Sequence, residues 1–235
     1  MRLLLVLALV SVAGCASAPQ HLSESQANIK SIAIVSVVPD RVNLEKTGLT
    51  VFNNQASQID MGSSVTDTIY AIARKRIQLA HPGWQVKAVD YDKGALLGKA
   101  RSAGLLLRSP TANMSDELAA LAKKNDVDAI LVVVSYRDAS HGYDDGITVR
   151  LHTLNLSTIQ HAYVRAIVNV AIVDRLGAIN VSGDGGAVTK LDAEGLGLKY
   201  ELKENDLPVI QEKLKDAAIS NLQNSMEDAF KAIGF

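Results

Sequence analysis

The sequence contains one cysteine, Cys15, in 235 residues. A single thiol can form no internal disulfide and cannot build a zinc site from several cysteines. Aromatic residues contribute only 4% of the chain, and 24 Lys and Arg nearly balance 25 Asp and Glu. This balance lacks the positive excess typical of nucleic-acid-binding domains, so we expect no nucleic-acid partner. Beyond the first residues, no apolar run approaches the ~18 residues that indicate a membrane-spanning helix.

Motifs that carry known chemistry are also missing. The chain has no Gly-x-Ser-x-Gly or Ser-x-x-Lys motif, no His-Glu-x-x-His and no phosphate-binding Gly-x-x-x-x-Gly-Lys. The nearest group is a polar loop with His141, Asp144, Asp145 and Asp138, whose side chains could hold a divalent cation. Their spacing matches no calcium loop, and a solvated loop is the alternative that we favour. We therefore predict no catalytic residues, no metal site and no cofactor.

The clearest signal in the sequence is its N-terminal segment. Arg2 is positively charged, and an almost unbroken apolar run follows over residues 3–13. This run is shorter than the ~20 residues that span a bilayer, so it predicts a secretory signal. Small residues then end at the single cysteine, in Val12-Ala13-Gly14-Cys15. This segment resembles the bacterial lipobox; the alternative is an ordinary signal peptide with a chance cysteine near its cleavage site.

The lipobox resemblance implies both a cellular location and a membrane anchor. It makes residues 1–14 the signal peptide and places a diacylglycerol on the sulfur of Cys15, with a further acyl chain on the new amino group. More than one chain is needed for stable attachment to a bilayer. Ala16, in place of aspartate, implies the periplasmic face of the outer membrane by the sorting rule of enteric bacteria. Residues 15–28 are small and polar, which predicts a flexible tether after the lipidated cysteine.

Residues 29–235 predict a single domain of the α/β (α+β) class. We expect a mixed sheet with an antiparallel hairpin half, packed by about four helices including a long C-terminal one. Apolar runs predict strands at 31–38, 129–135, 147–155 and 161–174, with shorter or weaker ones at 42–44, 49–52, 84–91 and 178–182. Helical spacing predicts helices that begin at Ser63 or Ser64, Asp92, Ser115 and Asp206. The segment Gly183-Asp184-Gly185-Gly186 predicts a turn, before an irregular stretch to Asn205.

The strands at 147–155 and 161–174 permit a prediction of register. Their apolar residues share one face when Leu151 pairs with Val164, which leaves a four-residue loop at 156–159. A slip by one residue would turn the apolar side chains of one strand to the opposite face. We therefore expect this pairing.

The same register brings two arginines together on the other face. It places Arg150 opposite Arg165, and His152 opposite Tyr163. Like charges in direct opposition destabilise a sheet, and a local conflict of this kind can mark a functional surface. These four residues form our candidate surface for a partner or an anion. The alternative, which we favour for the arginines, is that they point into water or pair with nearby carboxylates.

The order of elements also resembles one group of periplasmic lipoproteins. The resemblance depends on Asp126–Val134, where a helix runs directly into an apolar strand, and on the following hairpin and closing helix. It is a similarity to lipoproteins of the curli-secretion-channel type and to those that activate penicillin-binding proteins, which share a small α/β domain. The resemblance implies binding or assembly rather than catalysis, and it transfers no site residue.

Three functions follow as hypotheses. The first is an outer-membrane-anchored binding or assembly module, not an enzyme, whose partner is an envelope protein or a cell-wall polymer. The second is a subunit of an oligomeric secretion or export complex, a homo-oligomer in which the strand at 161–174 joins a sheet between chains. The third is an envelope hydrolase with an unrecognised site near His141 or Asp144.

Overall fold

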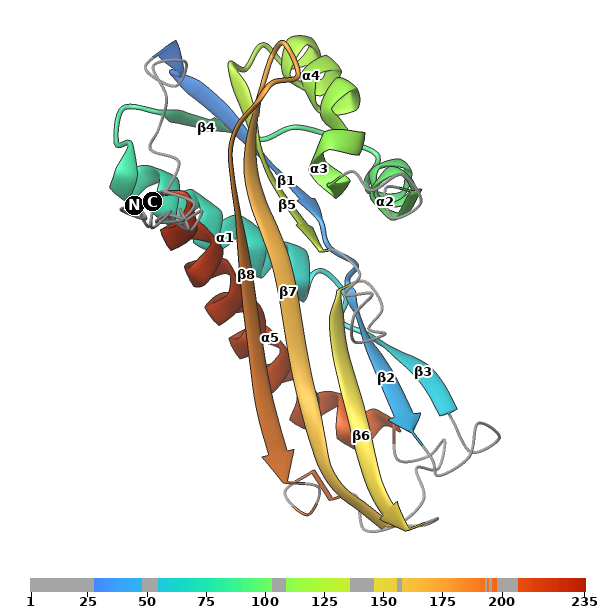
Figure 1. Ribbon diagram of the computed structural model, residues 1–235. Coiled ribbons are helices and arrows are strands. Elements are labelled where there is room, and N and C mark those ends of the chain that lie inside the picture. Colours follow the sequence, from blue (N-terminus) through green and yellow to red (C-terminus); the bar gives the residue numbers. More distant parts are fainter. Residues whose placement is uncertain are drawn as a thin grey trace, which may run out of the picture.

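The computed structural model describes residues 28–47, 55–102, 109–135, 146–155, 158–192, 194, 196–197 and 207–235 (Figure 1). Eight strands form one mixed sheet. They are β1 (Ser31–Val37), β2 (Arg41–Thr47), β3 (Gln55–Asp60), β4 (Gln85–Lys87), β5 (Ala129–Ser135), β6 (Ile147–Asn155), β7 (Thr158–Asp174) and β8 (Ile179–Asp192). The described helices are α1 (Ser64–Ala80), α2 (Lys93–Ser102), α3 (Pro110–Asn113), α4 (Ser115–Lys124) and α5 (Leu207–Ala232).

Strand β7 is the central strand of the sheet and pairs with three others. Its first part pairs antiparallel with β6 and its last part with β5, while β8 runs antiparallel along its other edge. Strand β1 lies parallel to β5, and β2 lies parallel to β6, with β4 and β3 outside them. The sheet therefore has an upper half (β5, β1, β4) and a lower half (β6, β2, β3), joined by β7 and β8 (Figure 1).

Helices cover the two faces of this sheet unequally. Helices α1 and α5 pack on one face, over a core that includes Ile34, Leu131, Leu151 and Phe230. Helices α2, α3 and α4 pack on the opposite face, but only over the upper half (Figure 1). Among the described helices, none covers the lower half of that second face. We call this surface the outer face; it is the side of β2, β6, β7 and β8 that points away from α5.

The predicted fold class is confirmed: the sheet is mixed, its hairpin half is antiparallel, and a long helix closes the chain. The predicted strand at 129–135 coincides with β5, and every residue of it is buried. The helix predicted to begin at Ser63 or Ser64 is α1, in which Val65, Ile69, Ala73 and Ile77, at helical spacing, are buried, while Ile72 is partly buried. In the described part of the chain, no helix is both long and apolar enough to cross a membrane.

The predicted turn at Gly183-Asp184-Gly185-Gly186 is wrong. These residues lie in the middle of β8, which continues to Asp192 instead of ending near Ser182. A side chain at Gly183 or Gly185 would collide with α5, because a Cβ at Gly183 would lie 2.7 Å from the carbonyl oxygen of Ala229. The glycines are therefore needed for close packing of a helix on a strand, not for a turn.

The weaker strands were only partly predicted. The expected strand at 42–44 forms part of β2, and its antiparallel partner is β3, Gln55–Asp60, which begins after the predicted segment 49–52. The predicted segment 49–52 lies outside the described residues. Strand β3 is a polar outer strand, in which only Ile59 of the apolar residues is a core residue, so its hydrophobic pattern is weak. The predicted strand 84–91 shortens to the three residues of β4.

Candidate functional site

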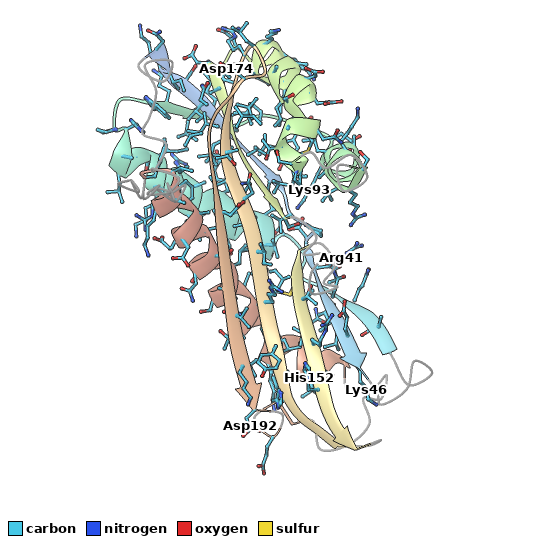
Figure 2. All side chains as sticks on the ribbon, in the orientation of Figure 1. Arg41, Lys46, Lys93, His152, Asp174 and Asp192 are labelled. Atoms are coloured by element: carbon cyan, nitrogen blue, oxygen red, sulfur yellow. The ribbon has the colours of Figure 1, made fainter. Side chains whose placement is uncertain are left out.

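The four residues predicted as a contact surface all lie on the outer face. Alternation along β6 points Val149 and Leu151 into the core, and therefore turns Arg150 and His152 to the other side. Alternation along β7 buries Ala162 and Val164 and turns His161, Tyr163 and Arg165 outward in the same way. Figure 2 shows His152 at the lower end of the sheet, near Asp192 of β8.

The predicted register is wrong by two residues. Val164 pairs with Val149 rather than with Leu151, which instead pairs with Ala162. A shift of two keeps every side chain on its expected face, so the hydrophobic pattern could not distinguish the two registers. The connection is also shorter than the expected loop, because β7 begins at Thr158 and register shifts interrupt the pairing beyond His152.

The corrected register removes the predicted clash of arginines. Arg150 lies opposite Tyr163, and Arg165 lies opposite Thr148. Both the Nε and Nη2 atoms of Arg150 donate to Oε2 of Glu45 on β2, at 3.3 and 3.0 Å. The alternative interpretation, in which an arginine pairs with a nearby carboxylate, is therefore correct for Arg150. Repulsion between arginines no longer marks this surface as functional.

The distinctive feature of the outer face is a cluster of three rings, those of His152, His161 and Tyr163. The rings of His152 and His161 stack with centroids 5.3 Å apart and planes 16° apart, because the two residues are directly paired across β6 and β7. The ring of Tyr163 stands edge-on to both, at 5.3 Å from His152 and 5.0 Å from His161. Aromatic pairs in these geometries attract each other beyond their simple burial.

The cluster continues onto β8. Lys190 and Asp192, both exposed, lie opposite Tyr163 and His161, and Val188 lies opposite Arg165 with 59% of its surface exposed. The outer face therefore combines three rings, cationic side chains and an exposed apolar residue. Aromatic residues and arginine are enriched at the centres of protein interfaces, so this composition suits a contact surface.

Electrostatics keep one ring of the cluster uncharged. Partial burial lowers the pKa of His152, and the neighbouring His161 and Arg150 lower it further by like-charge repulsion. His152 is therefore neutral at pH 7, which favours the stacked arrangement. Sequence reasoning missed His161 as a site residue; its signal was the alternation His161, Tyr163, Arg165, which places all three on one face.

Other predicted site residues cannot be placed. Cys15, and the loop with Asp138, His141, Asp144 and Asp145, lie outside the described residues. Within the described part of the chain, no group of three or more His, Cys, Asp or Glu side chains could hold a metal ion.

No protein-family model matches this chain, and a search of curated proteins finds no match. The function is therefore inferred from the sequence and from the surface itself.

Proposed function

We propose that this chain is a lipid-anchored protein of the cell envelope, at the periplasmic face of the outer membrane, that acts as a non-enzymatic binding or assembly module. The motif Val12-Ala13-Gly14-Cys15 supports the anchor, with Cys15 as the lipidated residue. The outer face supports the binding role and is the proposed contact surface. The partner is an envelope protein or a cell-wall polymer.

The observation that carries the binding role is the unequal covering of the sheet. Helices pack over both faces of the upper half, whereas on the lower half the described helices pack on one face only. The uncovered side is where three rings gather, at His152, His161 and Tyr163. Rings whose geometry is already fixed by strand pairing lose little side-chain entropy when a partner binds. This favours a surface prepared for contact.

Site-specific photo-crosslinking in intact cells tests the contact surface. A photoreactive amino acid at His152 is expected to give a discrete adduct, whose second component is then identified by mass spectrometry. The matched control is Gln78, which is also exposed but lies on α1, on the other side of the sheet. Adducts at both positions, or at neither, would contradict the outer face as the contact surface.

A second candidate function is a subunit of an oligomeric export complex. We expected the strand at 161–174 to join chains, but both edges of β7 are already paired. Among the described strands, β3, β4 and β8 each have a partner on one side only. Strand β8, with 14 residues, is the longest of these three, so an inter-chain sheet would form there.

Light scattering on the protein in detergent separates these two functions. A mass of one chain, after subtraction of the micelle, agrees with a single binding module. A stable ring of several chains would instead support the export subunit and contradict a module that acts alone.

A further inference from the structure

A cavity of about 530 Å³ lies where the upper half of the sheet meets the lower half. It is bounded by α2 on one side and by the hairpin of β2 and β3 on the other, with Lys93 and Arg41 on its wall (Figure 2). Small-molecule sites typically have volumes of about 300–1,000 Å³, so the space suits a small organic ligand. Its polar lining contains three cations and two carboxylates: Asp40, Arg41, Gln58, Asp60, Lys93 and Arg101.

The contacts of Asp40 fix one wall of this cavity. Its Oδ1 accepts hydrogen bonds from the backbone N–H and the hydroxyl of Thr66, at 3.0 and 2.8 Å, in the first turn of α1. Lys93 forms an ion pair with the same carboxylate and also donates to the hydroxyl of Thr66, at 2.7 Å. The charges of Asp40 and Lys93 therefore neutralise each other, and both residues have a structural role.

Arg41 differs from these residues. Its side chain is half-buried, and its Nε atom is buried without a hydrogen-bond partner. The strand pairing places Asp60 directly opposite, yet within the described part of the chain Arg41 has no ion pair with it or with any other carboxylate. Oδ1 of Asp60 instead accepts a hydrogen bond from the N–H of Gly62, at 2.9 Å.

A buried donor without a partner destabilises the folded state, and more so when the group is charged. Arg41 lines the cavity and, within the described part of the chain, pairs with no carboxylate, so a ligand could supply an acceptor for its guanidinium. Carboxylate and phosphate groups match the planar fork of a guanidinium, because they can accept two parallel hydrogen bonds. The amide of Gln58 and the second oxygen of Asp60 could hold polar groups elsewhere on the same ligand.

We propose that this cavity is a binding site for a small organic anion, whose carboxylate or phosphate group is held by Arg41. The site is separate from the cluster of His152, His161 and Tyr163 and does not depend on it, since its walls are α2 and the hairpin of β2 and β3. If no anion binds, the crosslinking result at His152 is unaffected.

Calorimetric titration of the full-length protein in detergent tests this site. The probes are inorganic phosphate and succinate, each at constant ionic strength. Saturable binding of at least one probe is expected, and its identity distinguishes a phosphate ligand from a carboxylate ligand. The variant Arg41→Gln is expected to bind at least about tenfold more weakly, because a charged hydrogen bond is lost. The matched control Lys75→Gln, an exposed cation on α1, should bind like the unmodified protein.

A second variant keeps the test decisive if Arg41→Gln does not fold. Arg41→Lys retains the charge but loses the planar fork, so we expect weaker binding than in the unmodified protein together with an unchanged thermal unfolding temperature. Absence of saturable binding for both probes would overturn the proposal, and so would unchanged affinity in the folded Arg41 variant.

Discussion

At the scale of single residues, Asp128 connects two distant parts of the chain. One of its carboxylate oxygens accepts hydrogen bonds from the backbone N–H groups of Lys30 and Ser31, at 2.9 and 2.8 Å, and from the Ser31 hydroxyl at 2.9 Å. Burial acts to raise the pKa of Asp128, but these hydrogen bonds outweigh burial and lower the pKa below its ordinary value of 3.8. The charged form is therefore the one that ties the start of β1 to the start of β5.

We expect Asp128→Asn to reduce the free energy of unfolding at pH 7 by about 1–3 kcal/mol, because bonds to a charged acceptor are lost. A carboxylate whose pKa is lowered by folding contributes stability above its unfolded pKa, and this contribution disappears as the pH falls through the folded pKa. The difference between variant and parent should therefore be constant near neutral pH and shrink below pH 3.8.

Urea unfolding at a series of pH values measures this difference. Asp90→Asn provides the control, because Asp90 is exposed and takes part in no hydrogen bond or ion pair with the described residues. Equal effects of the two substitutions at pH 7, or a difference that grows in acid, would contradict the role given to Asp128.

At the scale of elements, the contact between β8 and α5 is unusually close. Buried and exposed residues alternate along β8. Val181, Gly183 and Gly185 lie on its buried side, which faces α5. The hydroxyl of Ser225 donates to the carbonyl oxygen of Gly185 at 2.8 Å, which is possible only because no side chain separates the two backbones. The long helix is therefore positioned by glycines as well as by its apolar stripe.

Replacing Gly185 by alanine tests this contact. The new Cβ would overlap the carbonyl oxygen of Ser225 and lie 2.8 Å from the backbone nitrogen of Ala229, so the helix must shift. Overpacking of this kind costs about 1–3 kcal/mol. Gly186→Ala is the matched control in the same strand, because nothing lies within 4 Å of its Cβ position. We expect it to be neutral or slightly stabilising, since alanine restricts the unfolded chain.

Equilibrium denaturation of both glycine variants gives the answer. A larger decrease in the free energy of unfolding for Gly186→Ala than for Gly185→Ala would show that α5 does not approach β8 as described.

At the scale of the whole molecule, the anchor and the contact surface are separate features. The outer face belongs to the lower half of the sheet, whereas the proposed anchor is Cys15, near the start of the chain. Cys15→Ser removes the sulfur that a thioether requires, so we expect the protein to move from the membrane fraction to the soluble fraction of lysed cells.

Immunoblots of separated membrane and soluble fractions test the anchor. Ser17→Ala, two residues away, is the control and should stay with the membranes. A Cys15→Ser protein that still fractionates entirely with membranes would exclude the lipid anchor at this position.

The class of fold and the sides of its strands follow from local pattern alone. Apolar runs marked β5, helical spacing marked the buried side of α1, and period-two alternation assigned Arg150 and His152 to the same face as Tyr163. These features depend on residues close together in the chain, because burial selects one side of each element.

Pairing and partners were decided only by the tertiary structure. A register shift of two residues changes no face, so only the folded sheet placed His152 against His161 and gave Arg150 its carboxylate, Glu45, from another strand. The sequence around the glycines of β8 resembles a turn, because the constraint that requires glycine there is close contact with α5, a helix that follows later in the chain. Contacts between residues distant in sequence leave no periodic signal, and here they determined the composition of the proposed contact surface.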